Sequence, residues 1–183
     1  AVIDPGDDAQ RILELLRENA LALRYIFLTH GHFDHILAVP ELKKETGAQI
    51  VIHEADAPCL IDASLSLGPY RRGGQGAPAD IRAVDGHAFS LGALTFTYMH
   101  TPGHTRGSCV IVCGDVIFSG DTLFCGECGR CDLPGGSYPA MLASLKRLSG
   151  LAGDYRVYPG HEAQTTLEAE RRTNPYMREA MGK

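Results

Sequence analysis

Residues 27–36 read FLTHGHFDHI and hold three of the chain's 8 histidines, His30, His32 and His35, together with Asp34. A solvated polar loop has no need of so many imidazoles, whereas zinc, iron and manganese are bound by imidazole nitrogen and carboxylate oxygen. Residues 23–30 have a strand's aromatic and β-branched content, so the histidines follow the C-terminal end of a strand, where open α/β sheets place ligand sites. We therefore predict that this stretch forms one wall of a metal site.

A turn carrying four such side chains can serve two neighbouring metal ions. In an extended segment, alternate residues such as His30 and His32 point to the same side. A tight turn into a helix can then bring Asp34 and His35 beside them. Each ion needs further ligands, and three segments next to glycines supply candidates, because glycine lets the backbone turn a ligand into a pocket. These candidates are His104 in TPGHT, Asp121 in FSGDTLF and His161 in YPGHE. The other histidines, His53, His87 and His100, lack such settings and are expected to be core or surface residues.

Composition limits the class of protein. A chain of 183 residues with 44% hydrophobic content suits a single domain, which we expect to span residues 1–183. A net charge of −5 argues against electrostatic binding of nucleic acid. No apolar run approaches the ~18 residues of a membrane span. The opening AVIDPGDD does not resemble a secretory leader, so the 6 cysteines are expected to be reduced thiols in the cytoplasm.

Periodicity and turn residues predict alternating strands and helices. Strands are expected at 1–3, 23–30, 49–53, 87–100, 108–114, 116–121 and 155–161, and helices at 7–19, 35–46, 137–150 and 165–181. The strands between 87 and 121 are separated by glycine turns, as in an antiparallel meander. The segment 62–82 is rich in glycine and proline and is expected to be a mobile loop beside the site. Its Arg71 and Arg72 are interpreted as a solvated charge pair, with contact to an anionic substrate as the alternative.

The pattern His30-Gly31-His32-Phe33-Asp34-His35 matches the H-x-H-x-D-H motif, and the sequence resembles the metallo-β-lactamase-fold hydrolases from IDPG at residues 3–6 to RRTNPYM at 171–177. This resemblance implies an α/β fold, a four-layer αββα sandwich, and because the sequence opens within a strand we expect the first N-terminal strands to be missing. It also implies two divalent metal ions, with zinc expected and iron or manganese as alternatives. Its implied ligands are His30, His32 and His104 on one ion, Asp34, His35 and His161 on the other, and Asp121 as the bridge.

Within that group the sequence is most similar to glyoxalase II, hydroxyacylglutathione hydrolase, and its short single-domain relatives, through GDTLF, CGECGRCDLPGG and YPGHE. Asp121 matches a bridging carboxylate that true lactamases of this fold lack, so antibiotic hydrolysis is disfavoured. The resemblance implies hydrolysis of a small-molecule thioester, with Asp34 binding metal and accepting a hydrogen bond from the nucleophile. Arg130 matches the basic residue that holds the glutathione part. Asp132 stands where an aromatic partner is expected, which leaves the thiol carrier open.

Two other functions are carried as alternatives. The first is a sulfur dioxygenase that oxidises a persulfide on a single iron, for which the matching ligands are His30, His104 and Asp121. Cys131 and Leu133 depart from the loop typical of that branch, so the hydrolase is preferred. The second is a non-catalytic metal-binding remnant, which the intact ligand set argues against.

The spacing of Cys125, Cys128 and Cys131, C-x-x-C-x-x-C, suggests an iron–sulfur cluster. Such clusters normally need four thiolates, and only a proline follows where the fourth cysteine is expected. We therefore interpret the three cysteines as tolerated small side chains. A redox-sensitive pair or an accidental metal site is the alternative.

Overall fold

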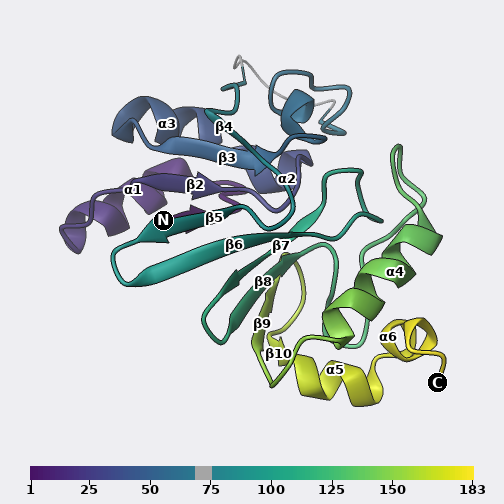
Figure 1. Cartoon of the computed structure of the whole chain (residues 1–183). Coiled ribbons are helices and arrows are strands. Elements are labelled where there is room, and N and C mark those ends of the chain that lie inside the picture. The colour runs from purple at the N-terminus through teal and green to yellow at the C-terminus, as the bar shows by residue number, and fades with distance from the viewer. Residues whose placement is uncertain (69–75) are drawn as a thin grey trace. The chain divides into compact units, whose positions relative to one another are not determined.

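The computed structural model describes residues 1–68 and 76–183. Clustering of the backbone divides the chain into two compact units, Ala1–Ala83 and Val84–Lys183, each with its own sheet and its own helices (Figure 1). The expectation of one domain over 1–183 stays a prediction. Arg71 and Arg72 lie outside the described residues.

The first unit is built on a four-stranded parallel sheet. Its strands are β1 (Val2–Ile3), β2 (Tyr25–Phe27), β3 (Gln49–His53) and β4 (Ile81–Ala83), hydrogen-bonded in that order. Parallel neighbours require crossover connections, which here contain α1 (Ala9–Glu18), α2 (Phe33–Ile36), α3 (Val39–Thr46) and the 3₁₀ turn η1 (Ala57–Leu60). This order brings the carboxyl ends of β1 and β2 side by side.

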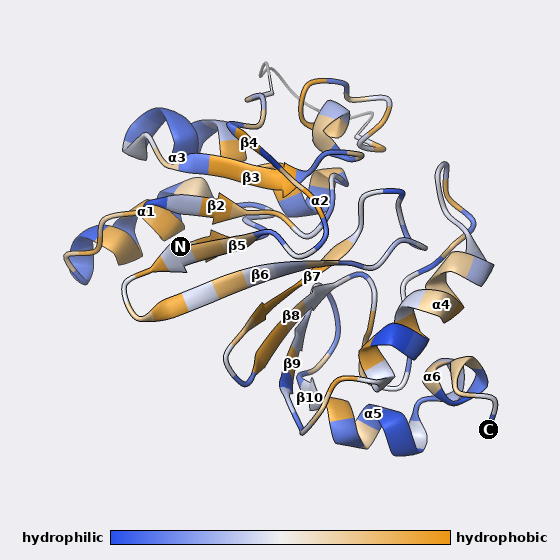
Figure 2. Ribbon diagram, in the orientation of Figure 1, coloured by the Kyte–Doolittle hydropathy of each residue, from blue (hydrophilic) through white to orange (hydrophobic). Residues whose placement is uncertain are grey.

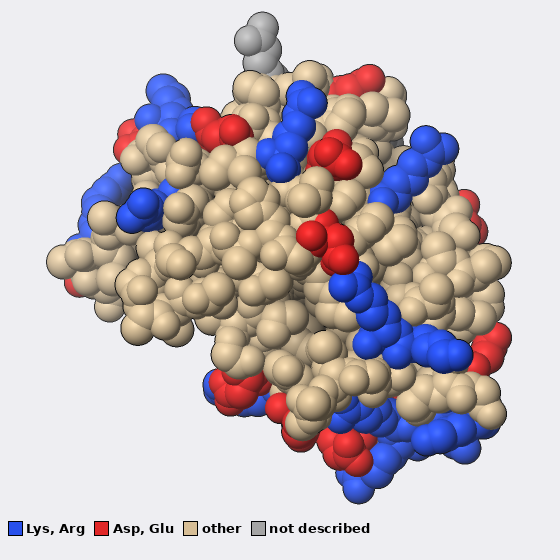
Figure 3. Space-filling view, viewed as in Figure 1, with Lys and Arg blue, Asp and Glu red and all other residues tan. Residues whose placement is uncertain are grey.

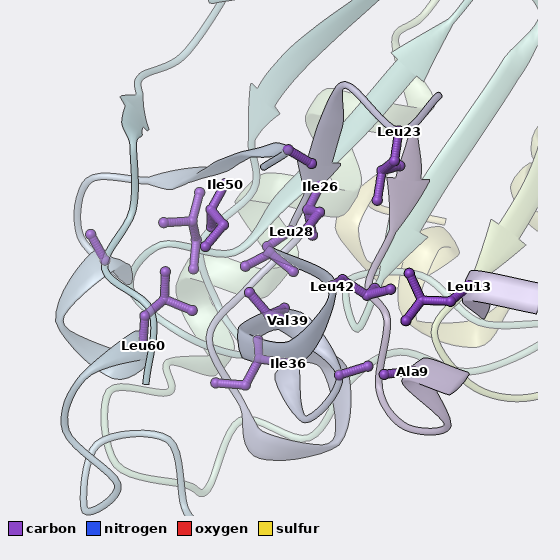
Figure 4. Close-up of a cluster of buried hydrophobic side chains, with 14 residues drawn as sticks. Ala9, Leu13, Leu23, Ile26, Leu28, Ile36, Val39, Leu42, Ile50 and Leu60 are labelled. Carbon is purple, nitrogen blue, oxygen red and sulfur yellow. The ribbon is translucent and has the colours of Figure 1, made fainter. Parts of the chain in front are cut away.

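The helices of the first unit bury one apolar face against this sheet. In α1 the Asp8 carboxylate caps the first turn by accepting from the Arg11 amide, and Leu13 is buried one turn later. The middle of β3, residues 50–52, is apolar, as Figure 2 shows, and β2 is buried along its length, as is typical of strands in parallel sheets. The buried cluster drawn in Figure 4 includes Ala9, Leu13, Leu23, Ile26, Leu28, Ile36, Val39, Leu42, Ile50 and Leu60.

The second unit is built on a six-stranded sheet in the order β10-β9-β8-β7-β6-β5. Its strands are β5 (Ala88–Leu91), β6 (Leu94–His100), β7 (Cys109–Cys113), β8 (Val116–Gly120), β9 (Arg156–Pro159) and β10 (Thr165–Thr166). The strands β5 to β8 form the predicted antiparallel meander, and β9 pairs with β8 in parallel. The carboxyl ends of β8 and β9 therefore lie at the same edge of the sheet.

The helices of the second unit are α4 (Tyr138–Ser149), α5 (Leu167–Thr173) and α6 (Pro175–Ala180). Ser137 caps α4 through the Ala140 amide, and Asn174 caps α6 through the amides of Tyr176 and Met177. The apolar face of α4 joins the strands in a core that includes Met99, Val110, Ile117, Leu123, Met141, Leu145, Leu148, Val157, Leu167 and Met177.

The structure corrects four of the predicted elements. The strand expected over 87–100 is two strands, because the chain turns at Gly92, which has φ +60°, and β6 runs back antiparallel to β5. The helix expected over 35–46 is two helices, because the chain turns after Ile36 and Pro40 stands in the first turn of a new helix. The expected loop 62–82 ends in β4, whose three residues pair with β3. The expected helix 165–181 is divided by Asn174, because Pro175 begins a new helix with its own cap.

Among the described residues, no helix combines the length and the apolar content needed to cross a membrane. On the face shown in Figure 3, basic and acidic side chains are interspersed, in line with the small net charge of −5.

Replacing Gly103 with alanine should destabilise the second unit. Gly103 has φ +150°, and an added Cβ would lie 2.5 Å from the Cα of Met141 in α4, so helix or loop must shift. Gly114→Ala is the control, because φ is +59° there as well but no atom lies within 4 Å of the added Cβ. We expect Gly103→Ala to lower the free energy of unfolding by about 2–4 kcal/mol and the control by about 1 kcal/mol, measured by urea denaturation. Equal losses of unfolding free energy in the two variants would contradict the tight contact between Gly103 and Met141.

Candidate metal centre

The histidine turn, residues 30–35, begins shortly after β2, and its three histidines are buried whereas Phe33 and Asp34 are exposed. His30, His32 and His35 are 1%, 5% and 3% exposed. The ring centroid of His30 lies 4.8 Å from that of His32 and 4.1 Å from that of His35. Three imidazoles of one short turn are thus gathered at one place. Asp34 lies at the outer side of the turn, with its side chain 38% exposed.

The carboxylate of Asp4 orients this turn. Its Oδ1 accepts from the Thr29 amide at 2.7 Å, and its Oδ2 accepts from the Thr29 hydroxyl at 2.6 Å. The same Oδ2 lies 3.0 Å from Nδ1 of His35. Because an ionised carboxylate can only accept, Nδ1 of His35 is the protonated nitrogen and Nε2 carries the lone pair.

The same reasoning extends to His30. Its Nδ1 lies 3.2 Å from the Thr29 hydroxyl oxygen. The single hydroxyl proton of Thr29 is donated to Asp4, so the oxygen can only accept from His30. Nδ1 of His30 is therefore protonated, and Nε2 is the nitrogen able to bind a metal ion. Asp4 thus fixes the tautomer of one histidine directly and of a second one through Thr29.

The sequence analysis missed this role of Asp4. It placed Asp4 in a turn, where aspartate is common, and nothing local distinguishes a turn carboxylate from a histidine partner. The signal that could have found it is topological. Asp4 directly follows β1, Thr29 lies two residues after β2, and the parallel sheet places the ends of these strands side by side. Asp4, His30 and His35 also form a group whose ligand atoms lie within 4.8 Å of one another.

Glycine makes the histidine turn possible. The Gly31 amide donates to Oδ2 of Asp56 at 3.0 Å, and an added Cβ at Gly31 would lie 2.4 Å from Cβ of Cys59. The turn therefore lies against η1 more closely than any side chain would allow.

The second unit gathers three of the predicted ligands at the carboxyl ends of its strands. His104 lies in the loop after β6, Asp121 directly follows β8, and His161 follows β9. Oδ2 of Asp121 lies 3.4 Å from Nε2 of His104 and 3.6 Å from Nε2 of His161. One carboxylate oxygen thus stands between two imidazole nitrogens, an arrangement of donor atoms that suits a metal ion.

A backbone carbonyl orients His104. Nδ1 of His104 lies 2.8 Å from the carbonyl oxygen of Arg130, which can only accept, so Nε2 again carries the lone pair. The segment that supplies this carbonyl packs tightly on the next ligand, since an added Cβ at Gly129 would lie 1.8 Å from the carbonyl oxygen of Asp121. Gly129 is therefore required for this approach.

The side chain of Arg130 is engaged by Asp132. Nε and Nη2 of Arg130 donate to Oδ1 and Oδ2 of Asp132 at 2.8 and 2.7 Å, a two-point pair whose side chains are 62% and 68% exposed. The hydrogen bonds from Arg130 lower the pKa of Asp132 to about 2. The carboxylate is therefore ionised throughout the neutral range.

The remaining histidines behave as expected. His53 is buried and accepts from the Ala55 amide at 3.3 Å, His87 stacks on Phe89, and Nε2 of His100 lies 2.9 Å from the Arg106 carbonyl oxygen. None of the three belongs to a candidate metal group among residues 1–68 and 76–183.

The cysteine triplet does not converge on a cluster site. Within the described part of the chain, the groups whose ligand atoms lie within 4.8 Å of one another contain no cysteine. Cys125 is exposed, whereas Cys128 and Cys131 are partly buried against the core of the second unit. Burial raises the pKa of Cys128 to about 12, so it is a thiol at neutral pH. These observations favour the interpretation of tolerated small side chains over an iron–sulfur cluster.

Similarity to known proteins identifies the family of this chain. The sequence profile of the metallo-beta-lactamase superfamily matches residues 1–161. The chain belongs to this superfamily. It is 34% identical to the hydroxyacylglutathione hydrolase GloC of Haemophilus influenzae, over 97% of this chain and 86% of that protein.

Two solved structures of the superfamily are also similar to this chain. The BLEG-1 B3 metallo-beta-lactamase has a TM-score of 0.88 at 34% identity, covering 96% of this chain and 87% of that one. TTHA1623 in a di-iron-bound form has a TM-score of 0.84 at 39% identity, covering 95% and 87%. The predicted fold class, the α/β metallo-β-lactamase fold with two sheets and helices on each, is thereby confirmed.

Replacing Asp4 with asparagine should weaken metal binding through the histidine turn. The amide nitrogen of asparagine cannot accept a hydrogen bond, so either His35 or Thr29 loses its acceptor. The tautomers of His35 and His30 are then no longer fixed. We expect the affinity for zinc to fall about 10–100-fold, measured by competition with a chromophoric chelator.

Asp80→Asn is the matched control for this variant. Asp80 likewise accepts from a backbone amide, that of Ile50 at 2.7 Å, and from a side chain, that of Lys43, but it is not bonded to a histidine. It should lower the free energy of unfolding and leave zinc affinity unchanged. If both variants bind zinc as the wild type does, Asp4 does not orient a ligand.

Proposed function

We propose that the chain is a metal-dependent hydrolase of small-molecule thioesters, of the glyoxalase II type. The observation that carries this proposal is that His30, His35 and His104 each have Nδ1 held by a hydrogen-bond acceptor, which directs Nε2 to act as a ligand. Histidines that bind metal ions are usually held in this way, because the partner of one ring nitrogen fixes the tautomer and the orientation of the ring.

We further propose a site of two divalent ions. Its ligands are His30, His32 and His104 on one ion, Asp34, His35 and His161 on the other, and Asp121 as the bridge. The donors are nitrogen and oxygen, which fit zinc, iron and manganese, and we propose zinc. The placement of one Asp121 oxygen between His104 and His161 supports the bridging role. The similar TTHA1623, solved with two irons, supports the number of ions.

Two bound cations would lower the pKa of a shared water and so supply a hydroxide nucleophile at neutral pH. The chain's own residues would then direct this nucleophile to the substrate. Asp34, partly exposed at the outer side of the histidine turn, is proposed to accept a hydrogen bond from the nucleophile and aim it at the carbonyl carbon. The thiolate leaving group has a pKa near ~8.5 and needs little protonation, so no side chain has to act as a strong acid.

The relative with the hydroxyacylglutathione hydrolase name supports a thioester in preference to other carbonyl substrates. A persulfide dioxygenase on one iron, held by His30, His104 and Asp121, is the second candidate, and the irons in TTHA1623 support iron as the metal but not a single ion. The similarity to BLEG-1 makes β-lactam hydrolysis a necessary control reaction.

The test is metal analysis of anaerobically purified protein, followed by three assays on the same sample. These measure hydrolysis of S-lactoylglutathione and a neutral lactoyl thioester, oxygen uptake with glutathione persulfide, and hydrolysis of a chromogenic β-lactam. We expect two metal ions and thioester cleavage. One iron with persulfide-dependent oxygen uptake would establish the second candidate instead, and full metal occupancy with no turnover would favour a non-catalytic protein.

Replacing Asp121 with alanine should lower thioester turnover more than about 100-fold, because a direct ligand should cost at least as much as the residues that orient ligands. Asp115→Ala is the control, since Asp115 lies in the turn before β8 whereas Asp121 directly follows that strand. Its turnover should equal that of the wild type. Wild-type rates in the Asp121 variant would remove that residue from the site.

A further inference from the structure

The loop after β8 contains a short hairpin, residues 123–128, whose two ends pair with each other. The hairpin begins two residues after Asp121 and ends two residues before Arg130. The Arg130 carbonyl oxygen is the hydrogen-bond partner of His104, at 2.8 Å from its Nδ1. Because only Gly129 separates the hairpin from Arg130, a displacement of the hairpin would move this carbonyl and release His104.

The hairpin also contacts a second proposed ligand. The ring centroid of Phe124, at the start of its turn, lies 6.0 Å from that of His161, with the two rings edge to face at 77°. The side chain of His161 is half-exposed, and an edge-to-face contact of this kind favours one orientation of the ring. Two proposed ligands, His104 and His161, therefore depend on the position of one hairpin.

Two buried polar side chains from the C-terminal helices hold this hairpin. Glu170 lies in α5, and its Oε2 accepts from the Gly126 amide at 2.9 Å. Asn174 lies between α5 and α6, and its Nδ2 donates to the Glu127 carbonyl oxygen at 2.9 Å and to Oε2 of Glu170 at 2.8 Å. The Thr165 hydroxyl donates to Oε1 of Glu170 at 2.6 Å. Glu170 and Asn174 are thus bonded to each other and to the turn of the hairpin.

Helix capping accounts for only part of these contacts. Burial of polar groups costs free energy unless they are hydrogen-bonded, so the partners of a buried side chain indicate its role. The cap of α6 uses only Oδ1 of Asn174, which accepts from the amides of Tyr176 and Met177, and a serine would cap as well. Nδ2 of Asn174 is not needed for the cap, and its hydrogen bonds go to Glu170 and to the hairpin.

We propose that Glu170 and Asn174 are positioning residues of the metal centre, which fix the hairpin and thereby orient His104 and His161. This inference rests on the proposed metal site and its hydrolase function. The two residues act through hydrogen-bond geometry, so the charge of Glu170 is not required and an uncharged side chain of the same shape should serve.

Asn174→Ser separates the positioning role from helix capping. Serine keeps the cap of α6, because its hydroxyl oxygen can accept from the same amides, but it has no group that reaches both Glu170 and the hairpin. We expect the affinity for zinc to fall about tenfold, measured by competition with a chromophoric chelator. The visible absorption spectrum of the cobalt-substituted protein should change as well, because that spectrum reports the arrangement of the ligands.

Two substitutions of Glu170 separate geometry from charge. Glu170→Ala removes the acceptor of Gly126 and Asn174, so zinc affinity should fall at least as far as in Asn174→Ser. Glu170→Gln keeps one acceptor oxygen for these two donors, and its amide can donate to the Thr165 hydroxyl. Zinc affinity and the cobalt spectrum of Glu170→Gln should therefore equal those of the wild type. The same loss in both Glu170 variants would assign the effect to charge and overturn the proposal.

Leu167→Ala is the matched control for lost stability. Leu167 lies in α5 with Glu170 and is buried in the core of the second unit, but its side chain cannot form a hydrogen bond to the hairpin. The control should lower the urea midpoint and leave zinc affinity and the cobalt spectrum as they are in the wild type. If it weakens zinc binding as much as Asn174→Ser does, stability alone explains the effect and the positioning role is wrong.

The binding measurements keep this inference separate from the proposed activity. A wild type that binds zinc but cleaves no thioester contradicts the proposed function, while zinc affinity and the cobalt spectrum still test the positioning role. Should Glu170→Ala fail to fold, Asn174→Ser decides, because its helix cap is kept. Wild-type zinc affinity and an unchanged cobalt spectrum in Asn174→Ser would overturn the inference, and a wild type that binds no metal would overturn both proposals.

Discussion

The hydrogen bonds accepted by the Asp4 carboxylate are the constraint on which the first half of the proposed centre depends. Parallel pairing of Ile3 with Phe27 places Asp4 beside Thr29, and both residues then lie at the same sheet edge as the histidine turn. One carboxylate fixes a backbone amide, a hydroxyl and an imidazole there. The sheet register thereby determines which ring nitrogen of His35 and His30 is available to a metal ion.

The second unit reaches the same result with an uncharged acceptor. His104 is held by a backbone carbonyl, not by a carboxylate. A carboxylate partner makes a ligating imidazole more electron-rich, whereas a carbonyl chiefly fixes its orientation. The carbonyl is available only because Gly129 lets the loop approach the backbone of Asp121. The second unit therefore orients its histidine through a close backbone contact, whereas the first unit uses a charged carboxylate.

Local patterns predicted much of the fold, and long-range contacts account for what they missed. The glycine turns between the strands of residues 87–121 are properties of neighbouring residues, so the sequence predicted the antiparallel meander directly. The pairing of Asp4 with His35 joins residues 31 positions apart, and the partner of His104 is a main-chain oxygen that every residue carries. The short strand β4 has three residues and is defined by its pairing with β3, not by its own composition.

Arg130 makes two separate contacts through different atoms. Its carbonyl oxygen holds His104, while its guanidinium is held by Asp132. Any residue at this position would supply the carbonyl, provided that Gly129 keeps the loop in place. The side chain of Arg130 is therefore not needed to hold His104, and substitutions at 130 and 132 should leave this imidazole in place. The orientation of His104 thus depends on the backbone of the loop and on Gly129, not on the exposed ion pair.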